Sequence, residues 1–128
     1  MRFIGRLLRK LGESDARLAC KCELQISYAC KLLGDSLGRL EHATRAVELA
    51  PRNELASMTR FHALLGCGQR VAAMEECVRF VTHSDSPAYR ELLSQGFGLD
   101  LPVDELELAV EARRLLRLHA QEPNGGSE

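Results

Sequence analysis

The five cysteines are the side chains of this chain best suited to metal or redox chemistry. Zinc is held by thiolates that converge on one ion, and the closest pair in the sequence is Cys20-Lys21-Cys22. Residues two apart on a helix point to nearly opposite sides, however, so these two thiols do not easily share an ion. Cys30 and Cys77 take apolar positions of the helical pattern described below. We therefore interpret the cysteines as structural residues and predict no metal site and no cofactor.

The histidines and glycines form no reaction centre in the sequence either. The four histidines are scattered, with neither an HExxH pattern nor Cys-His spacing. Gly66-Cys67-Gly68 and Gly96-Phe97-Gly98 resemble phosphate-binding loops, but neither follows a predicted strand or has the Lys-Ser/Thr of a Walker sequence. Helix termination explains both stretches better. We predict no catalytic residues and a protein that is not an enzyme.

The composition favours a single helical domain. The 128 residues are 45% hydrophobic and 27% charged, and aromatic residues make up only 5%. Leu, Ala, Arg and Glu abound while β-branched residues are few, which favours helix over sheet. A net charge of −1 creates no overall field that attracts nucleic acid, so no nucleic-acid partner is expected. An odd number of cysteines without a secretory signal points to the reducing cytoplasm.

Local signals predict six helices and no segment that alternates like a half-buried strand. Ser14 or Asp15 is expected to cap the first helix, which Gly34 ends. The other five predicted helices cover residues 36–50, 53–66, 70–82, 87–95 and about 102–119. Residues 121–128 are predicted to be a flexible tail.

The sequence matches itself when it is shifted so that Gly34 aligns with Gly68. The same shift aligns Val47 in the second predicted helix with Val81 in the fourth. Chance can align one apolar stripe of two amphipathic helices, but it does not readily align two stripes and the turn between them. The match therefore indicates an internal repeat of two helices.

The match to a known repeat motif rests on particular positions in each unit. In residues 20–53 they are Ala29, Gly34-Asp35, Leu40, Ala46, Val47, Leu49 and Pro51, and in residues 54–87 they are Ala63, Gly68, Ala73 and Val81. With its 34-residue period, this pattern resembles the tetratricopeptide repeat. Four kinds of position depart from the family: Glu23 and Ser57 replace tryptophan, Ser27 and Phe61 occupy a small-residue site, Arg39 occupies another, and Arg60 replaces an apolar residue.

The resemblance implies an all-α fold of stacked antiparallel helical hairpins. This tetratricopeptide-like α-solenoid would hold two to three repeats in residues 13–120, with residues 88–119 as a degenerate third pair, behind an N-terminal helix. Small side chains in such a stack let the helix axes approach closely. Here they are Ala29, Ala46, Ala63 and Ala73.

The resemblance also implies a concave groove that binds another protein. The corresponding positions are Lys21, Leu24, Tyr28 and Lys31 in the first unit and Leu55, Met58, His62 and Leu65 in the second. An apolar surface with cationic and aromatic edges suits a peptide or helix of some acidic character, as an adaptor, chaperone or assembly subunit would bind. The alternative is that several of these residues pack against the third helix pair and leave little groove.

Residues 1–12 form a basic amphipathic segment. Arg2, Arg6, Arg9 and Lys10 give it a charge of +4 without any acid, whereas residues 13–128 carry −5, since the whole chain is −1. Three interpretations stay open: a helix docked on the stack as a cap, a helix that contacts a membrane surface or a partner, and an Arg-rich organelle presequence. The second makes a peripheral membrane scaffold the alternative function. The oligomeric state is not indicated.

Overall fold

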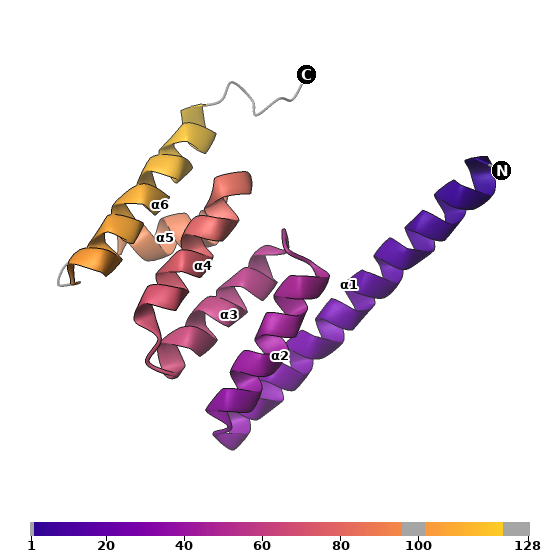
Figure 1. Cartoon of the computed structure of the whole chain (residues 1–128), viewed down its shortest axis with the longest axis horizontal. Coiled ribbons are helices and arrows are strands. Elements are labelled where there is room, and N and C mark those ends of the chain that lie inside the picture. Colours follow the sequence, from indigo (N-terminus) through magenta and orange to yellow (C-terminus); the bar gives the residue numbers. More distant parts are fainter. Residues whose placement is uncertain (1, 96–101, 122–128) are drawn as a thin grey trace.

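The computed structural model describes residues 2–95 and 102–121, and this part of the chain is helical (Figure 1). No strand occurs among the described residues, which confirms the all-α prediction. The helices are α1 (Arg2–Leu33), α2 (Ser36–Leu49), α3 (Glu54–Gly66), α4 (Arg70–His83), α5 (Pro87–Ser94) and α6 (Val103–Gln121). Residues 122–128 of the predicted tail and the stretch Gly96-Phe97-Gly98 lie outside the described residues.

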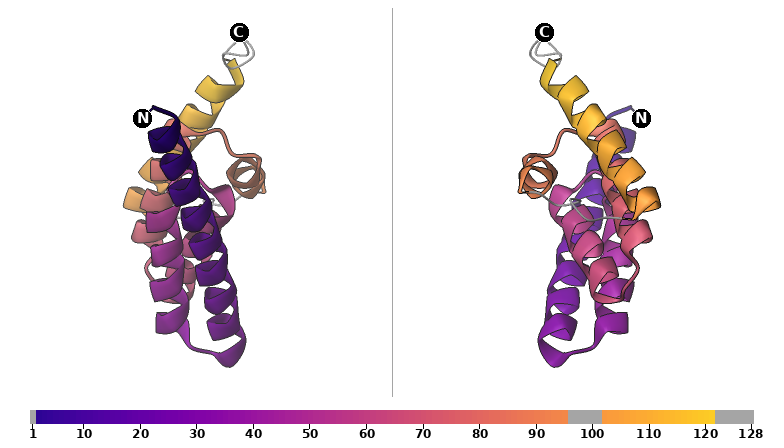
Figure 2. Two further views of the ribbon diagram at one scale, coloured as in Figure 1. Left: turned by 90° about the vertical axis from the view of Figure 1, so that its right-hand side faces the viewer. Right: turned by 90° about the vertical axis from the view of Figure 1, so that its left-hand side faces the viewer.

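The first four helices pack antiparallel in chain order, side by side. α1 lies against α2, α2 against α3 and α3 against α4, and α6 then packs on α4. The eight-residue α5 joins the core of the later helices through Tyr89 and Leu93, and Figure 2 shows it nearly end-on beside the longer helices. Residues 88–119 are therefore less regular than the first two helix pairs, because so short a helix offers little surface to its neighbours.

Most helix boundaries agree with the local sequence signals. Asn53 and Ser86 each accept a hydrogen bond from the backbone N–H three residues later and so cap α3 and α5. The predicted start of the first helix is wrong, because α1 begins at Arg2 and runs through Ser14 and Asp15 without a break. Both side chains are exposed, and the good helix formers around them outweigh the capping signal.

The two glycine hinges, at Gly34 and Gly68, have the same geometry. Gly34 has a φ of 78° and Gly68 one of 75°, a left-handed conformation that side chains disfavour. In each hinge the glycine N–H donates to the carbonyl three residues earlier, and the next N–H donates to the carbonyl five residues earlier. These bonds are Gly34 to Lys31 (3.2 Å), Asp35 to Cys30 (2.8 Å), Gly68 to Leu65 (3.0 Å) and Gln69 to Leu64 (2.9 Å).

The buried apolar side chains form one large and one small cluster. The large cluster joins α3, α4, α5 and α6 around Phe61, Met74 and Tyr89. The small cluster joins the first three helices and consists of Cys20, Ala46 and Ala56, with Leu24, Val47 and Ala50 packed against it. Most of the stabilising apolar burial therefore lies in the C-terminal part of the chain.

Three of the four alanines predicted to allow close helix packing are buried, namely Ala46, Ala63 and Ala73. The prediction is wrong for Ala29, which is exposed. It lies on α1, the first helix of the row, so no preceding helix covers its outer side.

A network of polar side chains is buried beside the large cluster. Glu76 is only 2% exposed. Its carboxylate accepts hydrogen bonds from Ser57 Oγ at 2.7 Å, Arg60 Nη1 at 2.8 Å and Arg79 Nη2 at 2.6 Å. Because Ser57 gives its one proton to Glu76, the Tyr89 hydroxyl donates to Ser57 Oγ, at 2.8 Å. Burial raises the pKa of Tyr89, so its hydroxyl stays protonated and remains a donor.

Both arginines of this network also reach the α2 hairpin. Arg60 Nε donates to Thr44 Oγ1 at 3.1 Å, and Arg79 Nη1 donates to the Pro51 carbonyl at 3.0 Å. The network therefore connects α2 and the turn after it with α3, α4 and α5. It also explains two departures from the tetratricopeptide pattern, since Ser57 and Arg60 supply hydrogen bonds to Glu76 instead of apolar packing.

The hinge geometry predicts opposite effects of alanine at different glycines. Gly34→Ala and Gly68→Ala should each lower the free energy of unfolding by about 1 kcal/mol, because both force a side chain into the left-handed region. Gly12→Ala should instead stabilise α1 by about 0.5–1 kcal/mol, since Gly12 is helical and a Cβ there meets no atom within 4 Å. Urea unfolding followed by circular dichroism measures all three, and equal stabilities of the three variants would contradict the prediction.

The Glu76 network predicts a large stability effect from one side chain. Glu76→Ala should lower the free energy of unfolding by about 2–4 kcal/mol, because it leaves Ser57 and two partly exposed arginines without their acceptor. Glu75→Ala is the matched control on the exposed side of the same helix and should change stability by less than about 0.5 kcal/mol. Thermal unfolding of both variants tests the network, and similar losses in the two would refute its importance.

Candidate binding cleft

A cleft lies between α1 and α3, with one residue of α2 at its side. Its volume is about 480 Å³, within the range of pockets that hold small molecules or peptide side chains. The cleft is lined by Leu24, Gln25, Ser27, Tyr28 and Lys31 of α1, Arg39 of α2, and Leu55, Met58, Thr59 and His62 of α3. The α3 residues recur at spacings of one, three and four and so lie on one side of that helix.

Six of the eight groove positions predicted from the sequence line this cleft. They are Leu24, Tyr28, Lys31, Leu55, Met58 and His62. Lys21 is exposed outside it, and Leu65 is half-buried against the large core cluster. Met58 also packs against that cluster, so burial within the helix row accounts for Leu65 and partly for Met58.

Four lining residues were not predicted from the sequence. Gln25 and Thr59 occupy the same position in the two repeat units and lie next to predicted groove positions, so the repeat spacing carried a signal for both. Arg39 stands where the family has a small residue, which was a second signal. Ser27 is buried and donates to the Arg39 carbonyl at 2.8 Å, so its hydroxyl joins α1 to α2.

The cleft carries positive charge, and no acid is among the described residues that line it. Within the described part of the chain, neither Lys31 nor Arg39 forms an ion pair with a carboxylate. Partial burial lowers the pKa of His62 below its ordinary 6.5, and the nearby Arg39 and Lys31 lower it further. At neutral pH, two unpaired cations therefore lie beside an apolar surface, an arrangement that favours a ligand with both apolar and acidic groups.

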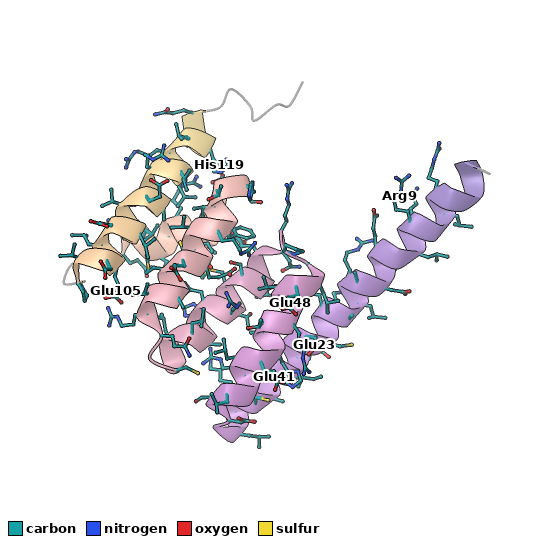
Figure 3. All side chains as sticks on the ribbon, in the orientation of Figure 1. Arg9, Glu23, Glu41, Glu48, Glu105 and His119 are labelled. Atoms are coloured by element: carbon teal, nitrogen blue, oxygen red, sulfur yellow. The ribbon has the colours of Figure 1, made fainter. Side chains whose placement is uncertain are left out.

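The basic N-terminal residues lie far from this cleft. Figure 1 shows the first turns of α1 extending beyond α2 and away from the later helices, and Figure 3 shows Arg9 projecting from this part. Arg6, Arg9 and Lys10 are exposed, and the side chain of Arg2 lies outside the described part of the structure. This exposure disagrees with a first helix that is docked on the other helices as a cap.

The cysteines are kept apart, as the helical spacing predicts. Cys20 is buried in the small cluster, whereas Cys22 is exposed on the other side of α1. Cys77 lies in the large cluster, where burial and the neighbouring Glu76 carboxylate raise the pKa of its thiol to about 12 and so keep it protonated. In residues 2–95 and 102–121, no three His, Cys, Asp or Glu side chains gather as metal ligands.

One serine motif was missed by the sequence predictions. Residues 34–38, Gly-Asp-Ser-Leu-Gly, have the G-x-S-x-G spacing of hydrolase nucleophiles. That motif acts on a sharp turn from a strand to a helix, whereas here it joins α1 to α2. The Asp35 carboxylate accepts the Gly38 N–H at 2.9 Å and caps α2. Among the described contacts, Ser36 Oγ has no hydrogen bond to a histidine, so the spacing serves helix capping.

Comparison with protein-family models, curated proteins and solved structures finds no match to this chain. None of the described helices combines the length and the apolar character needed to cross a membrane.

The cleft predicts how His62 titrates. Its NMR titration midpoint should lie below 6.5, and Lys31→Gln should raise it because one neighbouring cation is removed. Lys21→Gln removes a cation from the same helix outside the cleft and should leave the midpoint unchanged. The prediction fails if the two variants shift the midpoint equally.

The same pKa shift predicts a dependence of stability on pH. The folded pKa of His62 is below the unfolded value, so the unfolded chain takes up the proton first as pH falls. The stability contributed by neutral His62 is present above the unfolded pKa and is lost as pH falls through the folded pKa. His62→Gln should therefore lose less stability than the wild type on acidification. Urea unfolding at one pH above the unfolded pKa of His62 and at one pH below its folded pKa measures the difference.

Proposed function

We propose that this protein is a non-enzymatic protein-protein interaction module that binds an acidic peptide or helix in the cleft between α1 and α3. Its role would be that of an adaptor, a chaperone or an assembly subunit. The observation that carries the proposal is the combination of an apolar cleft with two cations, Lys31 and Arg39, that have no acidic partner among the described residues. Partner carboxylates would pair with these cations while partner apolar side chains fill the volume beside Leu55 and Met58.

The similarity of the first two hairpins supports a short tetratricopeptide-like stack. Their glycine hinges share one geometry, as described above. One contact between the paired helices also recurs. Glu23 Oε1 lies 2.6 Å from His42 Nδ1, and at the equivalent positions of the second unit Ser57 Oγ lies 2.7 Å from Glu76 Oε2. Equal hinges and equivalent contacts are expected of a repeat, in which each unit packs on its neighbours alone.

The exposed start of α1 favours a second candidate, a peripheral membrane scaffold. Arg6, Arg9 and Lys10 project beside Leu7 and Leu11, and all five side chains are exposed. Apolar and cationic side chains on one helix suit the surface of an anionic bilayer. Flotation with phosphatidylserine vesicles of the full chain and of a chain without residues 1–12 tests this candidate, which is excluded if the full chain does not float.

Two labelled peptides of about six residues, too short to form a stable helix along the outside of α1, test the cleft. Both have the same apolar residues, but one carries glutamate and the other lysine at the remaining positions, and fluorescence anisotropy measures their affinities. The wild type should bind the acidic peptide about tenfold or more tightly than the basic one, because like charges repel in the cleft. The double variant Lys31→Glu, Arg39→Glu should reverse this preference.

Arg52→Glu is the matched control, since it reverses an exposed cation outside the cleft. It should keep the preference for the acidic peptide, and circular dichroism checks that all variants fold. Equal affinities for the two peptides, or a reversal by Arg52→Glu, would disprove the cleft as the binding site. Affinity capture from the native source with the wild type and the double variant then identifies the natural partner.

A further inference from the structure

The side of α1 that faces away from α2 is exposed and mostly apolar, with Ser14 and Gln25 as polar residues at the same helical spacing. Its side chains recur at spacings of three, four and seven, as a helix face requires. We call this set the outer face: Leu7, Leu11, Leu18, Cys22, Ala29 and Leu32. All six are exposed, with Leu11 at 54%, Leu18 at 63% and Leu32 at 68%. The face extends over roughly 38 Å at 1.5 Å per residue, long enough to receive a whole helix.

The packing of α3 shows what such a face accommodates. Ala56 of α3 is buried in the small cluster with Ala46 of α2, and Arg60 reaches Thr44 of α2. In the alignment of the two repeat units, Ala56 corresponds to Cys22 of the outer face. At Cys22 the outer face thus repeats the side by which α3 packs on α2, but at the end of the row.

The charges beside the outer face determine which kind of partner helix can bind there. Residues 6–22 hold five cations and only two acids, Glu13 and Asp15. Lys10, Arg17 and Lys21 follow one edge of the face at helical spacing, and all three are exposed. None of them forms an ion pair with another described residue. A second copy of α1 would carry the same excess of positive charge, which disfavours self-association through this face.

We propose that the outer face of α1 is a second interaction surface, distinct from the cleft, which docks an amphipathic helix of another protein with acidic residues along its apolar stripe. Leucines of the face pack against the apolar stripe of that helix, and Lys10, Arg17 and Lys21 pair with its carboxylates. The repeat then continues across the interface, with the partner helix in the place that α2 takes against α3.

Two synthetic helices of about 25 residues, the length of the outer face, test this surface. Both have leucine and alanine on one side, and they differ in carrying glutamate or lysine along its edges. The binding is measured by fluorescence anisotropy to the full chain with Lys31→Gln and Arg39→Gln, because that background removes the cations by which the cleft attracts an acidic ligand and adds no charge that attracts the basic helix. The acidic helix should bind about tenfold or more tightly than the basic helix.

Variants of the outer face locate the binding. Adding Leu11→Glu and Leu18→Glu should weaken the acidic helix about tenfold or more, and both positions are exposed enough for the fold to tolerate the change. The control Leu106→Glu, Val110→Glu alters exposed apolar residues of α6 and should not affect binding. Circular dichroism confirms folding of each variant.

Four results would overturn the proposal. One is equal binding of the acidic and basic helices, and another is binding that Leu11→Glu, Leu18→Glu does not weaken. A third is that the acidic helix does not bind, whereas phosphatidylserine vesicles bind the wild type but not the Leu11→Glu, Leu18→Glu variant; this result would assign the face to lipid. The fourth is a dimer in sedimentation that the same variant dissociates, which would assign it to a second copy. Since the cleft lacks both cations in this background, failure here leaves the cleft proposal unaffected.

Discussion

The buried carboxylate of Glu76 is the interaction on which the arrangement of the central helices depends. A carboxylate removed from water is stable only if hydrogen bonds replace its hydration, and here Ser57, Arg60 and Arg79 supply them. These donors come from α3 and α4, and they in turn contact α2, the turn after it and α5. Any displacement of one helix would leave a buried polar group without a partner, so the network defines one relative position for these elements.

The cleft depends on this network through α3. One side of α3 carries Ser57 and Arg60, which face the Glu76 carboxylate, and another carries Leu55, Met58 and His62, which line the cleft. Because both sets belong to one helix, the contacts that position α3 against α2 and α4 also position the α3 side of the cleft.

The uneven core explains why the N-terminal helix exposes so much apolar surface. Large apolar side chains fill the space among α3, α4, α5 and α6, whereas α1 meets its neighbours through a small cluster that includes Cys20 and Ala46. A helix held mainly on one side by small residues keeps its other side available. In a row of helices the first and last members necessarily expose a face that interior members bury. Both proposed surfaces thus arise at α1, one on the side toward α3 and one on the side away from α2.

The sequence by itself determined the helices and their glycine hinges, because these follow from local chemistry: helix propensity and the conformational freedom of Gly34 and Gly68. Most of the cleft positions were expected from the resemblance to the tetratricopeptide repeat. The sequence did not predict that α1 continues through Ser14. The free energies of helix capping and of helix propensity differ too little at that residue for local rules to show which one prevails. Only the tertiary structure decided that Glu76 gathers distant partners, that Leu65 joins the core and that Ala29 faces solvent. Each of these depends on which other helix packs against the residue, and that is a property of the folded chain.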